Sequence, residues 1–252
     1  MTGRMRVGVA VVAGLLGFAA AASAQIPGMP LFTNPRYGTG IRLQADLGQA
    51  TGSGSLGNNN TVVQGGVTFA LGPLGIGANV GTNFRRAQAL AGGHDTLGVN
   101  DNFTASALAQ LRLLGGGANP LAFSIFGGAT GDITAQEVAA ASVHLKYPRL
   151  MNFPVGGALG VHFPLGMLSF NVWGSGRMVF TKYVNCPSSD PTGLGLDTWC
   201  SKTNNDFRWA VGVDLPFLKI LSFRAAYDSG KMMGATFNTW GVGASIGLGG
   251  MR

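Results

Sequence analysis

The chain has 252 residues, of which only 11% are charged and 42 are glycine, and its formal net charge is +7. A soluble domain averages about 25% charged residues and about 7% glycine. So few charges leave too little polar material to cover a water-facing surface, which indicates that part of the surface lies against an apolar medium. The basic residues are scattered singly apart from Arg85-Arg86, so a nucleic-acid-binding surface is not expected.

Residues 1–24 have the three parts of a secretory signal peptide. Arg4 and Arg6 form a short basic region, 7–22 is uncharged and apolar, and Ala22-Ser23-Ala24 is a cleavage site. The apolar stretch is too short for a membrane-spanning helix, which needs about 20 residues. We expect cleavage between Ala24 and Gln25, which leaves 228 residues with a net charge of +5.

Most of the remaining chain alternates apolar with small or polar residues at a period of two, which is typical of β-strands. Residues 155–176 lack a formal charge, but six glycines and Pro164 make a lipid-facing helix improbable there. The alternating segments predict ten strands, over 37–49, 61–71, 74–85, 102–114, 121–131, 154–163, 167–181, 206–215, 219–228 and 237–249. Counts of eight or twelve also fit the pattern.

The breaks between these strands alternate in length. Short breaks contain Pro73, Pro120, Pro164 and Pro216, which lie 47, 44 and 52 residues apart and suggest a repeated hairpin. Longer polar stretches cover 50–60, 86–101, 132–153, 182–206 and 229–236. Short turns that alternate with long loops are typical of bacterial membrane barrels, in which the turns are periplasmic and the loops extracellular.

The expected fold is therefore an all-β, closed, antiparallel up-and-down transmembrane barrel over residues 37–250, after a periplasmic N-terminal segment, 25–36. A soluble lipocalin-like protein is the alternative, because its strands also alternate. The predicted strands run about 10–13 residues, which suits a tilted membrane strand better than the usual 5–6 residues of a soluble sheet. Aromatic residues near the strand ends are expected to form interfacial girdles: Phe84, Phe103, Phe163, Phe180, Tyr183, Phe207, Trp209, Phe217, Phe223, Tyr227, Phe237 and Trp240.

The chain resembles small bacterial outer-membrane β-barrel proteins over nearly all of 37–250. The most specific element is the last strand, where 241–248 is similar to the C-terminal insertion signal of such proteins, although the chain ends on Gly-Gly-Met-Arg and not on an aromatic residue. The resemblance implies a location in the outer membrane, contact with its lipid, and barrel-assembly and periplasmic chaperone machinery as partners. It names no extracellular ligand and no cofactor.

The alternation also predicts which charges point into the barrel. The expected lumen-facing residues are Arg42, Asp46, Arg85, Arg112, Arg208, Asp214, Arg224 and Asp228. They would form either a network of ion pairs that fills a narrow lumen or a basic path that favours anions. Barrels of about eight strands are filled by side chains, whereas water channels occur nearer 16 strands, so the filled lumen is favoured.

The remaining candidates are few. Cys186 and Cys200 share one long loop, and an oxidising compartment predicts a disulfide between them. His94, His144 and His162 lack a convincing nucleophile or carboxylate partner in the sequence, so no catalytic or metal-ligating residue is assigned.

The leading expectation for function is a non-enzymatic barrel with surface loops, structural or ligand-binding. A narrow anion-leaning channel is the alternative, and a hydrolase with its site in the loops is the second alternative.

Overall fold

The structure is a computed structural model that describes residues 29–52, 60–85, 88–89, 96–99, 102–116, 119–134, 137–140, 143–146, 149–165, 168–184, 202–217, 220–232 and 235–248. Among these residues, no helix is long and apolar enough to cross a membrane. Strands dominate instead, as the period-two pattern predicts.

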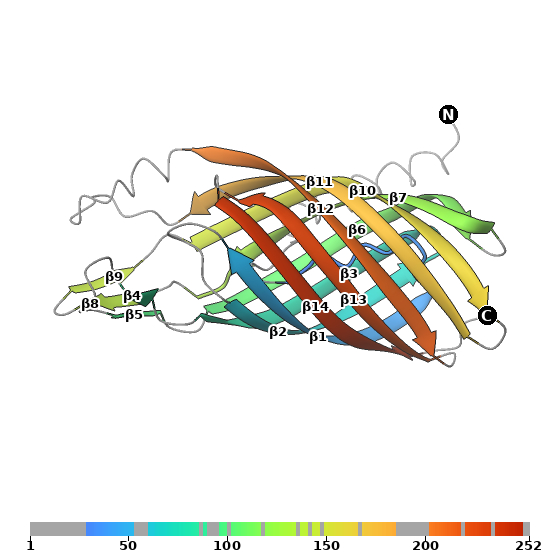
Figure 1. Cartoon of the computed structure of the whole chain (residues 1–252), viewed down its shortest axis with the longest axis horizontal. Coiled ribbons are helices and arrows are strands. Elements are labelled where there is room, and N and C mark those ends of the chain that lie inside the picture. The colour runs from blue at the N-terminus through green and yellow to red at the C-terminus, as the bar shows by residue number, and fades with distance from the viewer. Residues whose placement is uncertain are drawn as a thin grey trace, which may run out of the picture.

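Ten long strands form a closed antiparallel barrel (Figure 1). They are β1 (Gly40–Gly52), β2 (Asn60–Leu71), β3 (Leu74–Arg85), β6 (Asn102–Gly116), β7 (Asn119–Asp132), β10 (Arg149–Leu165), β11 (Leu168–Val184), β12 (Thr203–Phe217), β13 (Leu221–Met232) and β14 (Ala235–Leu248). Each strand pairs with the next long strand, and β1 closes the ring against β14, with Ile41 opposite Leu248. The predicted fold class and strand number are confirmed.

The two ends of the barrel differ. At one end, here named the turn end, the strands are joined by the short connections 72–73, 117–118, 166–167 and 218–220. β1 begins and β14 ends at this same end. The opposite end, named the loop end, carries the connections 53–59, 86–101, 133–148, 185–202 and 233–234. The prediction of a loop over 229–236 was wrong for most of that range, because β13 and β14 continue their pairing to Met232 and Ala235.

Two loop-end connections contain short strands that the sequence analysis missed. They are β4 (Gln88–Ala89), β5 (Thr96–Val99), β8 (Glu137–Ala140) and β9 (Val143–Lys146). They form a separate four-stranded sheet in the order β4-β5-β8-β9, which joins the connection after β3 to the connection after β7 (Figure 1). Strands of two to four residues are too short to produce a clear alternation in the sequence.

The turn-end prolines lie where strand pairing stops. Pro73 is in the β2–β3 turn, while Pro164 and Pro216 are the second-last residues of β10 and β12. The β6–β7 pair contains a register shift after Arg112, and Gly115 there has a φ of 87°. A glycine tolerates this positive φ, which lets the strand bulge before its turn.

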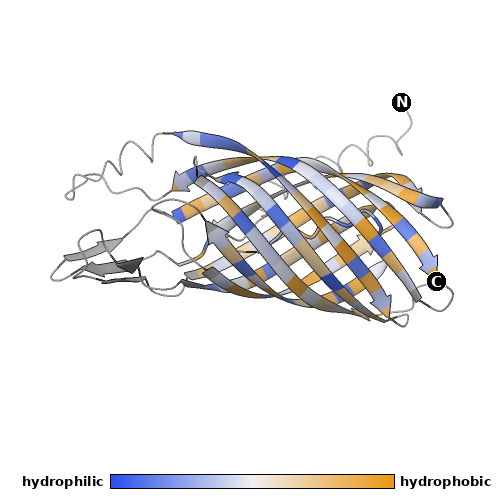
Figure 2. Ribbon diagram, viewed as in Figure 1, coloured by the Kyte–Doolittle hydropathy of each residue, from blue (hydrophilic) through white to orange (hydrophobic). Residues whose placement is uncertain are grey.

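The barrel is apolar outside and polar inside. Leu43, Val155 and Phe207 are 48%, 57% and 58% exposed, whereas Gln64, Thr181 and Asp228 are buried. Figure 2 shows hydrophobic and hydrophilic residues interspersed along the strands. A water-soluble barrel would have the opposite polarity, so this wall is suited to lipid. Most predicted girdle aromatics with described side chains are exposed or half-buried, but Phe237 is buried.

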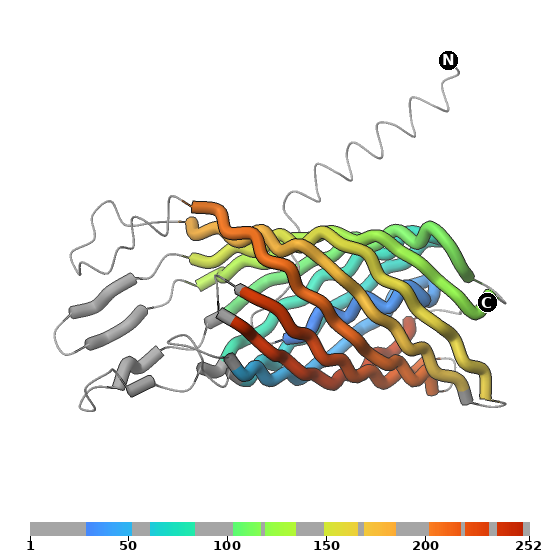
Figure 3. The backbone as a smooth tube through the Cα atoms, turned by 45° about the horizontal axis from the view of Figure 1, so that its top comes forward, coloured from blue at the N-terminus to red at the C-terminus, as the bar shows by residue number. Residues whose placement is uncertain are grey.

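Residues 29–39 lie inside the barrel. Figure 3 shows this segment as a blue tube within the ring of strands. Met29, Leu31 and Thr33 are buried, and the chain then reaches the turn end, where β1 begins. The expected periplasmic segment 25–36 therefore differs from the structure over 29–36. The cause is a set of apolar and hydrogen-bonding contacts with the lumen wall that no local pattern could indicate.

Candidate functional site in the barrel lumen

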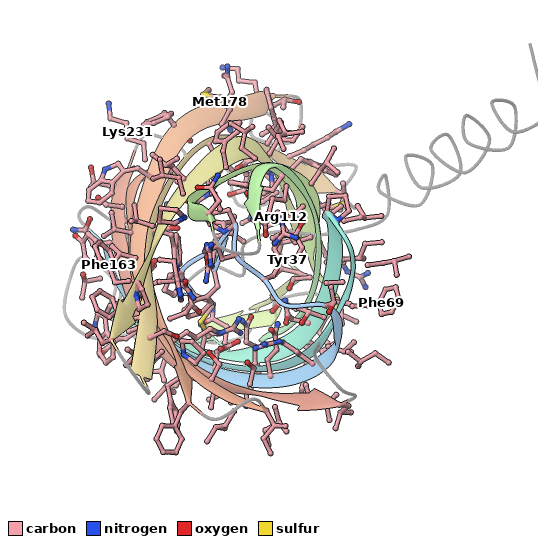
Figure 4. All side chains as sticks on the ribbon, turned by 90° about the vertical axis from the view of Figure 1, so that its right-hand side faces the viewer. Tyr37, Phe69, Arg112, Phe163, Met178 and Lys231 are labelled. Atoms are coloured by element: carbon pink, nitrogen blue, oxygen red, sulfur yellow. The ribbon has the colours of Figure 1, made fainter. Side chains whose placement is uncertain are left out.

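The lumen collects the polar side chains of alternate strand positions, because successive strand residues point to opposite faces. Seven of the eight predicted lumen charges take part in described hydrogen bonds: Arg42, Asp46, Arg112, Asp214, Arg208, Arg224 and Asp228. Arg112 lies at the turn end, inside the ring of strands (Figure 4). Arg85 ends β3, and its side chain lies outside the described part of the structure.

Asp228 is the centre of a buried charge cluster. One carboxylate oxygen accepts hydrogen bonds from Arg208 Nε at 3.0 Å and Nη2 at 2.8 Å. The other accepts from Arg177 Nη2 and from the Leu31 backbone N–H, the latter at 3.4 Å. Arg177 and Arg208 are directly opposite each other on β11 and β12, so the carboxylate offsets two facing positive charges.

Arg177 is a charged lumen residue that the sequence analysis missed. It is 1% exposed, although it lies in a strand that was predicted. The signal was present, because Met178 and Phe180 are exposed on the opposite face and Val179 and Thr181 are buried. The glycines at 174 and 176 have no side chain, and they obscured the alternation at this point.

Asp46 and Arg224 form a second buried ion pair across an intervening strand. Arg224 Nε and Nη2 donate to the two Asp46 oxygens at 2.7 and 2.6 Å, and Gln64 Nε2 donates to the same carboxylate at 2.8 Å. Gly243 on β14 is opposite both charged residues. A Cβ at Gly243 would lie 1.8 Å from Asp46 Oδ1, so this glycine provides the space that the ion pair crosses.

Other lumen residues are joined along the wall in the same way. Trp173 Nε1 donates to Asp214 at 2.7 Å, and the indole lies over Gly212, where a Cβ would come within 2.3 Å of the ring. On the other side of the barrel, Asn79 accepts from Gln44 and donates to Ser106 Oγ at 3.0 Å. All the wall-to-wall bonds described here join neighbouring strands or strands with a single strand between them. None of these bonds crosses the lumen axis, which another part of the chain occupies.

The N-terminal segment occupies that axis, because its side chains contact strands on opposite sides of the barrel. Met29 packs against Val62 of β2, and Leu31 packs against Phe126 of β7 and Ala158 of β10. Phe32 packs against the cluster of Trp173, Ala210 and Ala226 on β11, β12 and β13, and its ring lies 4.2 Å from the Arg224 guanidinium carbon. The segment is therefore the apolar centre of a polar lumen.

Arg36 and Tyr37, near the C-terminal end of the segment, are bound at the turn end. The Tyr37 hydroxyl donates to the Pro73 carbonyl and accepts from the Arg112 backbone N–H at 3.2 Å. The Arg112 side chain donates to the carbonyls of Tyr37 at 3.4 Å and Gly72 at 3.2 Å, and its guanidinium lies 5.3 Å from the Tyr37 ring centre. Arg36 donates to the Asn119 carbonyl. Figure 4 shows Tyr37 and Arg112 together inside the ring.

Burial shifts the pKa values of Tyr37 and Arg36. It raises the pKa of Tyr37 above its ordinary value of 10.0, against the opposing effects of the Arg112 N–H and charge. Burial also lowers the pKa of Arg36, and the nearby Arg112 charge lowers it further. Tyr37 therefore stays neutral, and able to donate its hydrogen bond, throughout the physiological range.

A cavity of about 180 Å³ remains beside the segment. Its lining combines Arg36, Arg42, Arg224 and Asp214 with the amides of Gln44, Gln64, Asn79 and Gln110. Together with Arg112 and Asp46, the charged residues of this lining make up four guanidinium groups and two carboxylates among the described residues. The cavity is therefore lined by both apolar and polar side chains, and its charged groups have an excess of positive charge.

The other candidates from the sequence are not brought into this site. Residues 1–24 with the Ala24/Gln25 cleavage site, Cys186, Cys200 and His94 lie outside the described residues, as does the side chain of His144. His162 is described, and its Nδ1 lies 2.8 Å from Asn171 Oδ1 near the turn end. Within the described part of the chain, no three His, Cys, Asp or Glu side chains are grouped so that they could hold a metal ion.

No family model and no curated protein sequence matches this chain. Among solved structures, the β domain of the Bordetella autotransporter BrkA is similar with a TM-score of 0.52 at 10% identity, over 84% of this chain and 100% of that one. The translocator domain of the autotransporter NalP from Neisseria meningitidis has a TM-score of 0.43 at 13% identity, over 82% and 88%. The outer membrane protease OmpT from Escherichia coli has a TM-score of 0.40 at 8% identity, over 87% and 99%.

These solved structures are bacterial outer-membrane β-barrels. The likeness to the BrkA domain agrees with the closed ring of strands described above. The chain therefore has the fold of a bacterial outer-membrane β-barrel.

Proposed function

We propose that this protein is a non-enzymatic integral outer-membrane barrel that is closed at rest by its own N-terminal segment. The observation that carries the proposal is the position of residues 29–37 on the lumen axis, in contact with opposite walls. A barrel of ten strands is narrow, so one extended segment with buried side chains is enough to block it. The protein then acts through its surfaces and not as an open pore.

The loop end supports a role in binding. The β4-β5-β8-β9 sheet links two connections that would otherwise be independent, and it extends beyond the barrel rim (Figure 1). Loops on a rigid scaffold are common sites of recognition. In this proposal the loop end faces the cell exterior and contacts a ligand or partner, while the turn end faces the periplasm.

Two measurements test the proposal. In planar bilayers, the purified wild-type barrel is expected to give no conductance steps. In intact cells, an external protease is expected to cut within 185–202 and to leave the barrel strands whole. Steady conductance by the wild type would contradict the closed state, and cleavage only after the periplasm is opened would contradict the orientation.

A narrow anion-leaning channel is the second candidate, and the charge at the turn end favours it. Arg36, Arg42, Arg112 and Arg224 outnumber Asp46 and Asp214 among the described groups there. A positive vestibule attracts anions and disfavours cations. Wild-type conductance with a reversal potential set by chloride would make this candidate the better one.

A further inference from the structure

We infer that residues 29–37 are a displaceable plug, and that the lumen they vacate is a conducting pathway for small anions. The inference rests on the proposed closed barrel and adds an activity to it.

The wall is shaped for the plug by glycines. A Cβ at Gly160 would lie 2.8 Å from Pro35 Cγ, and a Cβ at Gly75 would lie 3.0 Å from Tyr37 Cε2. Neither glycine has a positive φ, so both strands would accept alanine in their backbone conformation. At both positions the tight contact is with the plug and not with a neighbouring strand. These glycines therefore serve the docking of the plug.

The plug is not part of the strand ladder, and its described bonds to the wall each involve a side chain. The Leu31 N–H donates to Asp228, Gln110 Nε2 donates to the Thr33 and Asn34 carbonyls at 3.2 and 3.3 Å, and Arg36 and Tyr37 form the turn-end bonds given above. By contrast, β10 and β11 are paired along their whole length from Arg149 opposite Val184 to Leu165 opposite Leu168. The plug can therefore leave its position while the wall stays closed.

The wall bonds do not depend on the plug. Arg177 and Arg208 stay paired with Asp228, and Arg224 stays paired with Asp46, because all these residues belong to the strands. With the plug displaced, these side chains lie along the wall and no longer pack against Leu31 and Phe32. Arg36 leaves with the plug, and the lumen charges named above that remain on the wall are Arg42, Arg112, Arg177, Arg208 and Arg224 against Asp46, Asp214 and Asp228. This excess of positive charge favours anions.

The test is conductance of the full mature chain carrying G75A and G160A together. Each methyl group overpacks the docked state, and we expect the fraction of open time to rise roughly tenfold or more for each substitution. In a potassium chloride gradient, the reversal potential is expected to have the sign of chloride selectivity, and R42Q is expected to reduce it. G127A is the matched control, because a Cβ at Gly127 has only ordinary contacts, at 3.8 and 3.9 Å. It is expected to stay silent.

The outcomes separate this inference from the proposed function. A silent wild type with a folded but silent G75A/G160A variant overturns the plug and leaves the closed barrel standing. A conducting wild type overturns the closed barrel itself. Cation selectivity of the opened variant overturns the anion pathway.

A second measurement covers the case in which the variants do not fold. In the wild-type protein, backbone amides of 29–37 are expected to exchange hydrogen faster than those of β10 and β11, because a displaceable plug opens without unfolding the wall. Equal protection of the plug and these strands would overturn the inference.

Discussion

Two carboxylates, Asp46 and Asp228, each neutralise buried guanidinium groups in the lumen. A buried ion pair stabilises a protein little more than well-packed apolar side chains would in the same place. The loss of one partner, however, leaves the other charge buried without compensation. At the scale of single residues, the lumen therefore depends on a few carboxylates. Gly243, which is opposite Asp46, supplies the room that its ion pair with Arg224 needs.

Replacing the carboxylate of Asp228 is expected to have a large effect. D228N leaves Arg177 and Arg208 facing each other without a negative charge, and we expect it to destabilise the barrel by about 3–5 kcal/mol. Urea unfolding of the barrel in lipid vesicles measures this change. K231Q is the control, because Lys231 is exposed on the outer side of β13 (Figure 4) and its loss is expected to stay within about 0.5 kcal/mol. Equal effects of the two variants would contradict the buried cluster.

The ionisation of Tyr37 is expected to weaken the docking of the N-terminal segment at high pH. Its pKa is raised above 10.0 by burial, so its contribution to docking of the N-terminal segment is present below pH 10.0 and is lost as the pH rises through the raised pKa. The difference in tyrosinate absorbance between wild type and Y37F is expected to titrate with a midpoint above 10.0. A midpoint at or below this value would contradict the burial of the hydroxyl.

At the scale of elements, each strand separates a lipid face from a lumen face. Ten ranges were predicted from this alternation, and each overlaps one barrel strand of the structure. The ends were less accurate, because β10 begins at Arg149 and β13 ends at Met232, beyond the predicted residues. Strand ends are set by the pairing partner, which a single segment does not contain.

A charge on the lipid face is expected to be costly. Val211 lies near the middle of β12 and is 47% exposed. V211R is expected to destabilise the barrel by about 2–4 kcal/mol in a bilayer, whereas T203R at the loop end of the same strand is expected to cost about 0–1 kcal/mol. Unfolding in lipid vesicles measures both. In a water-soluble barrel an exposed Val211→Arg change would be nearly neutral, so a small effect would contradict membrane insertion.

The connection between β11 and β12 carries the predicted disulfide, which lies outside the described residues. If Cys186 and Cys200 are bonded, the 15-residue loop they close stabilises the protein by about 3 kcal/mol in the chain-entropy account. Peptide mass analysis without reductant is expected to find the linked pair, and C186S/C200S is expected to lower stability by that order. Two free thiols in protein isolated under oxidising conditions would contradict the prediction.

At the scale of the whole molecule, polar groups are enclosed and apolar groups face outward, so the barrel needs an apolar medium. We expect the protein to be extracted only with detergent, and the unheated sample to migrate faster on a gel than the heated one, because the closed barrel resists unfolding. Y183F, a conservative change near the loop end, is the control and is expected to keep this shift. Purification from the aqueous fraction without detergent would contradict the membrane barrel.

The amino-acid sequence by itself determined the class of fold, the strand positions and the polarity of the wall. The physical reason is that these features depend on local alternation, which is complete within each segment. It also indicated seven lumen charges that the structure joins by hydrogen bonds, although it could not indicate their partners. Asp46 meets Arg224 only because Gly243 lies between them on β14, and this contact follows from strand register.

Only the tertiary structure decided that residues 29–39 lie inside the barrel. The segment is short and has no periodic pattern, and its stability there comes from contacts with strands that are distant in sequence, such as Leu31 with Phe126 and Ala158. The alternation predicts a lumen but does not say what fills its axis. That depends on the closure of all ten strands around one segment, which is a property of the whole chain.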